Sequence, residues 1–136
     1  MKQFFRSTLG PAAVSMVAAS LVLSMTLGSG SALAHADHGK PQFGGVVAEA
    51  GMAQFEVVGK DGRITVHVTS HGTPVETAGA SGKLTVLDGT SKSEIDLAPA
   101  GENRLQGAGK VPAGAKLLLN VKLPGKPALQ ARAVMN

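Results

Sequence analysis

Apolar and polar residues alternate most regularly between Arg63 and Gly72, in the stretch RITVHVTSHG. A period of two is typical of a β-strand with one buried face. Here the apolar positions are Ile64, Val66 and Val68, and the polar ones are Thr65, His67 and Thr69. Asp61-Gly62 comes just before this stretch and predicts a tight hairpin turn, because both residue types tolerate positive φ angles.

Short apolar runs separated by Gly, Pro, Asn and Asp continue to the end of the chain. They predict strands over 46–48, 53–58, 63–70, 83–87, 92–97, 104–106, 116–123 and 128–135, with 104–106 as a brief edge strand. Seven or eight short strands at this spacing indicate an all-β fold, a small antiparallel β-sandwich of immunoglobulin-like architecture. A small open barrel is the competing topology, and the pattern does not separate the two.

The predicted core consists of branched aliphatic side chains rather than aromatic ones, because the inward positions of these strands carry Ile, Val and Leu. Its members are Ile64, Val66, Val68, Leu84, Val86, Ile95, Leu97, Leu117, Leu119 and Val121.

The first 34 residues have the features of a secretory signal peptide, which predicts a helix that is removed and a periplasmic location. Lys2 and Arg6 are followed by a mostly apolar segment over 12–27. Ala32-Leu33-Ala34 then fits the small-x-small cleavage pattern. An uncleaved membrane anchor is the alternative, disfavoured because hydroxyl residues interrupt an apolar run that is short for a spanning helix.

Cleavage after Ala34 leaves a flexible, histidine-containing lead over 35–42 and one β domain over 43–136. Ala34-His35-Ala36 also reads small-x-small, and cleavage there would remove His35. After the first cut, 11 Lys and Arg stand against 9 Asp and Glu, a net charge of +2. So small a charge, with two remaining aromatic residues, argues against nucleic-acid binding.

Enzymatic chemistry has little support in this sequence. The chain has no cysteine, which also excludes disulfides and lipid attachment to a cysteine. Gly79-Ala80-Ser81-Gly82 lacks the spacing of a nucleophile elbow. Gly107-Ala108-Gly109-Lys110 lacks both the spacing of a phosphate loop and a following helix. The carboxylates are scattered, so we expect no enzyme.

The four histidines are the candidate metal ligands, because imidazole suits copper, zinc and nickel. They are His35, His38, His67 and His71. At a free N-terminus, His35 could chelate Cu(II) through its amine and its ring. Four residues along a strand span about 13 Å, so His67 and His71 share an ion only if the chain folds back sharply or the lead crosses to meet one of them.

The sequence leaves two alternatives open, one for the histidines and one for Met52. In the first alternative the chain binds no metal: two histidines are solvated surface residues, and the other two belong to a flexible tail. Met52 is a candidate soft ligand for Cu(I), although a lone methionine beside Gly51 is more typical of a core edge.

Several segments resemble small periplasmic proteins encoded with bacterial heavy-metal and copper resistance systems. They are HADHG, FGGVVAEAGMAQFEVV, HVTSHGTPVETAGASGKLTVLDG, LAPAGENRL and LPGKPA. The chain is also similar to the N-terminal extension of some metal-efflux adaptor subunits. The resemblance implies metal handling in the periplasm, with His35, His38 and His71 as candidate ligands and His67 ranked behind them.

The sequence therefore favours a periplasmic metal-binding accessory protein, a copper or zinc buffer or a carrier to a component of an efflux system. No membrane contact is expected after signal cleavage. The rival hypothesis is a non-enzymatic interaction module that docks on an envelope partner through a sheet edge, without a metal site. The metal, the partner and the oligomeric state are not specified by the sequence.

Overall fold

The computed structural model describes residues 39–136, and in this part of the chain all regular structure is β. The strands are β1 (Val46–Ala50), β2 (Ala53–Lys60), β3 (Arg63–Ser70), β4 (Thr73–Pro74), β5 (Ser81–Asp88), β6 (Ser91–Pro99), β7 (Arg104–Ala108), β8 (Lys116–Lys122) and β9 (Leu129–Val134). Every pairing is antiparallel. The all-β antiparallel prediction is confirmed, and only the two-residue β4 had no counterpart among the expected strands.

The predicted signal peptide lies outside the described residues, which contain no helix able to span a membrane.

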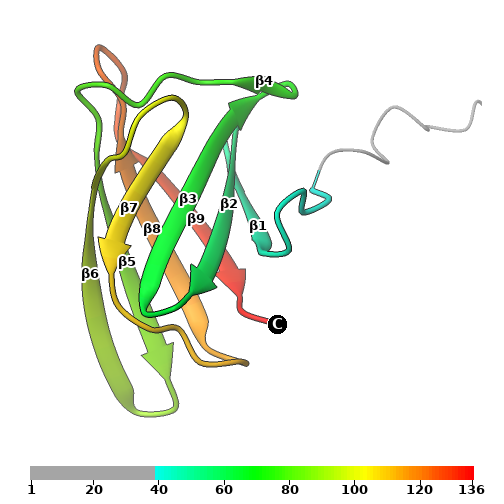
Figure 1. Cartoon of the computed structure of the whole chain (residues 1–136), viewed down its shortest axis with the longest axis vertical. Coiled ribbons are helices and arrows are strands. Elements are labelled where there is room, and N and C mark those ends of the chain that lie inside the picture. Colours follow the sequence, from blue (N-terminus) through cyan, green and yellow to red (C-terminus); the bar gives the residue numbers. More distant parts are fainter. Residues whose placement is uncertain (1–38) are drawn as a thin grey trace, which may run out of the picture. The chain divides into compact units, whose positions relative to one another are not determined.

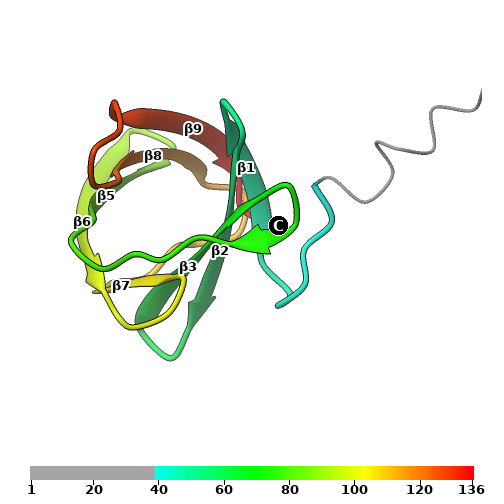
Figure 2. The same ribbon diagram turned by 90° about the horizontal axis from the view of Figure 1, so that it is seen from above.

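The strands form one continuous sheet that curls into a nearly closed barrel (Figure 1). Their order is β1-β2-β3-β7-β6-β5-β8-β9, with β4 paired to β3. The two ends of this path, β1 and β9, lie side by side, as the view from above shows (Figure 2). A sandwich needs two separate stacked sheets, so the immunoglobulin-like prediction is corrected to the barrel-like alternative.

Strand β6 is the physical reason for this continuity. Its residues Ser91–Leu97 pair with β5, and its last two residues, Ala98 and Pro99, pair with β7. One strand therefore belongs to both halves of the sheet. Strand β7 approaches β6 so closely that a Cβ on Gly107 would lie 2.3 Å from the Asp96 carbonyl oxygen. Because β7 is paired on both sides, its prediction as an edge strand is wrong.

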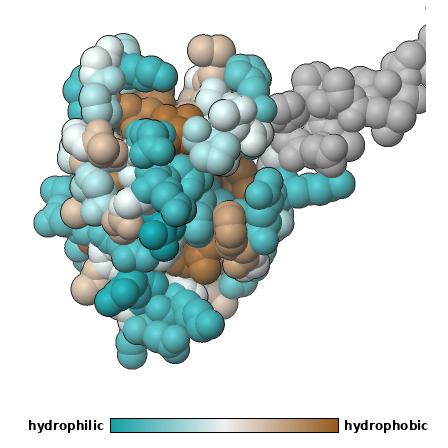
Figure 3. Space-filling model, turned by 45° about the horizontal axis from the view of Figure 1, so that its top comes forward, coloured by the Kyte–Doolittle hydropathy of each residue, from teal (hydrophilic) through white to brown (hydrophobic). Residues whose placement is uncertain are grey.

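The barrel interior holds the predicted core. All ten residues of the aliphatic list are at most 6% exposed. Phe55, Val57 and Leu105 join them as fully buried side chains, so the prediction of a core without an aromatic residue is wrong. Burying each large aliphatic or aromatic side chain contributes about 1.5–3 kcal/mol. Polar side chains cover most of the face seen in Figure 3, with apolar ones visible between them.

The Asp61-Gly62 turn forms as predicted. Both residues have positive φ angles, 53° and 72°, and the flanking Lys60 and Arg63 are directly paired. This two-residue connection sets the register of β2 against β3, and with it the side chains that meet on the outer face.

The alternation along β3 predicts a sharp contrast between neighbouring substitutions. Val66 points into the core and is fully buried, whereas Thr65 points outward and accepts a hydrogen bond from Gln106 Nε2. We expect Val66→Asp to destabilise the fold by on the order of 4 kcal/mol or more, because it buries an unpaired charge. Thr65→Asp keeps an acceptor for Gln106 and should cost less than about 1 kcal/mol. Urea unfolding of both variants checks this, and equal damage would contradict the inward–outward assignment.

Candidate functional site

Residues 42–45, here called the strap, cross the outer face of β2 and are held there by a single carboxylate. The backbone N–H of Gln42 donates to Glu56 Oε2 at 2.8 Å. The N–H groups of Phe43 and Gly45 both donate to Glu56 Oε1, at 2.7 and 3.0 Å. Alternation points Glu56 away from the core, yet its side chain is only 7% exposed because the strap covers it. Three hydrogen bonds to a charged acceptor offset the cost of removing this carboxylate from water.

Two glycines allow the strap to run this close to β2. A Cβ on Gly45 would lie 2.2 Å from the Val57 carbonyl oxygen, a separation that no side chain tolerates. Gly44 has a φ of 79°, in the left-handed region that glycine enters at little cost. The Phe43-Gly44-Gly45 sequence thus provides an aromatic ring followed by the two residues that let the backbone pass.

The aromatic ring of the strap covers His67. The Phe43 and His67 ring centroids are 3.8 Å apart, and the planes are inclined by only 11°. His67 is the register partner of Glu56 on β2 and of Arg104 on β7. A carboxylate, an imidazole and a guanidinium therefore lie in one row across three strands, with Phe43 stacked on the middle member.

Burial is the main influence on the pKa of His67 and lowers it from its ordinary value of 6.5. The Glu56 carboxylate acts in the opposite direction and Arg104 adds a smaller lowering effect. With its pKa lowered, the imidazole is neutral at pH 7, which is the form that binds metals.

A small hollow of about 30 Å³ lies beneath the strap. Glu56, His67, Gln54 and Thr69 line it together with Lys40 and parts of the strap. A hollow of this volume is large enough for a single water molecule or small ion. Its polar lining consists of oxygen and nitrogen atoms.

Arg104 limits what this hollow can hold. Its Nη2 donates to the Ala100 carbonyl at 3.1 Å, and its Nε is buried without a hydrogen-bond partner among the described residues. A guanidinium in the same row as His67 repels a metal cation. One imidazole and one carboxylate that already accepts three hydrogen bonds are therefore too few ligands for a stable transition-metal site.

The other predicted ligands are placed elsewhere. His71 is exposed in the turn between β3 and β4, where its φ of 49° and that of Gly72 at 77° form a second two-residue hairpin connection. His35 and His38 lie outside the described residues. Within residues 39–136, no three His, Cys, Asp or Glu side chains gather as a metal site. Met52 is 73% exposed beside Gly51, so its interpretation as a core-edge residue is wrong.

The sequence pattern did not predict Glu56, Phe43 or Arg104 as neighbours of His67. A signal for Glu56 was present in the sequence, since it stands directly between the apolar residues Phe55 and Val57. Its partners are backbone N–H groups more than ten residues away, which no side-chain pattern specifies.

Comparisons of the chain with family models, with curated proteins and with solved structures find no match.

Replacing Glu56 with Gln should release the strap. An amide nitrogen cannot accept a hydrogen bond, so at least one of the three N–H groups loses its partner. We expect a destabilisation of about 1–3 kcal/mol and faster hydrogen exchange at Gln42, Phe43 and Gly45. The matched control is Glu49→Gln, because Glu49 is exposed and its carboxylate accepts a hydrogen bond from the Gln54 side chain, at 2.9 Å from Nε2, rather than from the strap. Equal stability and unchanged exchange in the two variants would refute the role of Glu56.

The pKa of His67 makes folding stability depend on pH. The folded state disfavours the charged ring, so the unfolded chain binds a proton more readily between the two pKa values. Above about pH 6.5 the ring is neutral in both states, and His67 then leaves the folding stability at its full value. As the pH falls from there through the lowered folded pKa, folding stability is lost, because the folded state disfavours the proton that the unfolded chain binds. An NMR titration should find the pKa of the His67 ring below 6.5, moving upward in Phe43→Ala because the ring becomes hydrated. A wild-type value at or above 6.5 would contradict this assignment.

Proposed function

We propose that this chain is a periplasmic metal-binding accessory protein that handles copper or zinc, as a buffer or as a carrier to a component of an efflux system. The observation that carries the proposal is the anchored strap. It holds the chain segment that follows His38 against the strand bearing His67, and it does so through three hydrogen bonds to Glu56.

Chain length brings the N-terminal histidines within range of His67. Gln42 is bonded to Glu56, and register partners on antiparallel strands lie about 4.5–5.5 Å apart. His38 precedes Gln42 by four residues, and an extended chain spans at most about 3.3–3.6 Å per residue. Its reach of about 14 Å is longer than the spacing between the register partners Glu56 and His67, and the reach of His35 is longer still.

Donor chemistry favours a borderline transition metal over calcium or magnesium. Imidazole nitrogens suit Cu(II) and Zn(II), whereas calcium and magnesium prefer oxygen ligands. His67 contributes a neutral ring held in place by stacking against Phe43. His35, His38 and a free N-terminal amine would supply the remaining nitrogens. Because the Arg104 guanidinium repels a cation, His67 does not suffice by itself, and the proposed site needs ligands from the lead.

The strap also changes the ranking of the candidate ligands. The sequence placed His67 behind His71, since a ring on a straight strand meets the lead only if the lead folds over that face. The strap lies on that face, and His71 stands in an exposed turn. In the proposed site His67 is a ligand and His71 is not.

Matched substitutions test the proposal. We expect His67→Asn to weaken Cu(II) and Zn(II) binding by the mature protein about tenfold or more, since it removes one ligand. His71→Asn should leave the affinity unchanged, and Asn suits the positive φ at this position. Isothermal titration measures both. If His71→Asn weakens binding and His67→Asn does not, the site is wrongly placed. Wild-type protein that binds neither metal more tightly than about 10 μM would refute the metal function itself.

A further inference from the structure

The outer face of β5, β8 and β9 carries a second surface feature, which shares no residue with the hollow at the strap. Leu87 and Val134 are 40% and 55% exposed and are both register partners of Lys116. Leu118 follows two residues after Lys116 on the same face of β8 and pairs with Arg132. We call these three apolar residues the apolar–basic patch, together with two cations: Lys116, which lies between Leu87 and Val134, and Arg132, which lies beside Leu118. These residues line a common depression on the sheet.

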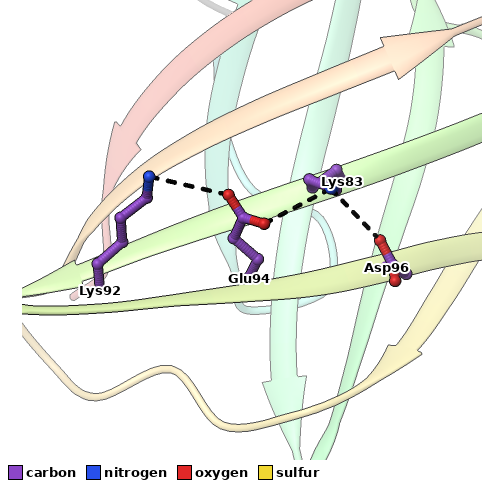
Figure 4. Close-up of polar contacts among 4 residues, drawn as sticks. All are labelled: Lys83, Lys92, Glu94 and Asp96. Atoms are coloured by element: carbon purple, nitrogen blue, oxygen red, sulfur yellow. Dashed lines mark ion pairs between the residues drawn. The ribbon is translucent and has the colours of Figure 1, made fainter.

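The charges on this patch differ from those on the neighbouring strands. On β5 and β6, Lys83 lies 3.5 Å from Glu94 and 3.9 Å from Asp96, and Lys92 lies 3.8 Å from Glu94 (Figure 4). The sheet thus neutralises Lys83 and Lys92 with its own carboxylates. Lys116 and Arg132 are exposed and form no ion pair with any described residue. Their alkyl stems extend the apolar surface while their charged ends remain in water.

We infer that the apolar–basic patch docks an extended segment of a partner protein that carries carboxylates and aliphatic side chains on one face. The carboxylates would pair with Lys116 and Arg132, and the aliphatic side chains would cover Leu87, Leu118 and Val134. This inference does not depend on metal binding. A second copy of the chain is a poor occupant, because a symmetric contact would bring the cations of one patch against those of the other.

The spacing of the cations specifies the segment further. Val134 is directly opposite Lys116, and Arg132 is two residues from Val134, so Lys116 and Arg132 are diagonal neighbours. Diagonal neighbours on antiparallel strands lie about 7–8 Å apart. In an extended chain, residues i and i+2 point to the same side at a separation of about 6.6 Å. Two acidic residues at alternate positions therefore match the two cations.

A synthetic peptide tests the inference directly. The probe is a capped seven-residue peptide with leucine at both ends, glutamate at the third and fifth positions and serine elsewhere. Titrated into the folded protein, it should shift the amide resonances of β5, β8 and β9 around the patch, with a Kd below about 1 mM. The same peptide with lysine in place of glutamate should not bind.

Variants with intact cores provide the controls. Lys116→Glu combined with Arg132→Glu should weaken binding of the acidic peptide about tenfold or more, since two attractive pairs become repulsive. Leu87→Ser combined with Val134→Ser should also weaken it. Lys122→Glu changes an exposed cation on the same strand but outside the patch, and it should have little effect. Thermal melting confirms that each variant is folded.

Four results would overturn the inference. The first is that the acidic peptide shifts no amide resonance of the patch. The second is that the lysine peptide binds equally well, and the third is that the acidic peptide still binds the variant with Lys116→Glu and Arg132→Glu. The fourth is concentration-dependent dimerisation or binding to phosphatidylglycerol vesicles through these residues in the absence of peptide binding, which would assign the patch to a second copy or to a lipid surface.

Discussion

A buried carboxylate must find hydrogen-bond donors, and this requirement at Glu56 organises the candidate site. The donors are three backbone N–H groups of the strap, at 2.7–3.0 Å. Satisfying Glu56 brings Phe43 over His67, and the stacked ring removes the imidazole from water. The lowered pKa of His67 and the position of the incoming chain both follow from this contact.

The barrel-like sheet supplies the frame on which this contact is built. Alternation sends most aliphatic side chains inward and the residues between them outward, so that Glu56, His67 and Arg104 meet in one row on the outer face. The same alternation places Leu87, Lys116 and Val134 in another row, on β5, β8 and β9. One row is covered by the chain itself, and the other is exposed. The two proposed functions therefore occupy separate parts of one small sheet and can be tested separately.

Much of the fold was predictable because it depends on local pattern. The period of two identified the inward residues from Ile64 to Val121, and Asp61-Gly62 identified a turn from its tolerance of positive φ. The closure of the sheet was not predictable, since it depends on Ala98 and Pro99 continuing β6 onto β7. Phe55 was missed as a core residue because residues 53–58 were read as one short apolar run, although Phe55 and Val57 stand on either side of Glu56 in an alternating pattern. The candidate site depends on long-range backbone hydrogen bonds, which leave no mark on side-chain spacing.

The proposed function requires that a metal ion bound by this chain be held at His67 together with the N-terminal histidines. The most direct measurement is a long-range ¹H–¹⁵N spectrum of the imidazole nitrogens of the mature protein, recorded as Zn(II) is added to one equivalent. We expect the resonances of one ring nitrogen of His67 and of at least one N-terminal histidine to shift together, while those of the His71 ring do not shift. A His67 ring that stays unchanged while other histidines bind the zinc would contradict it.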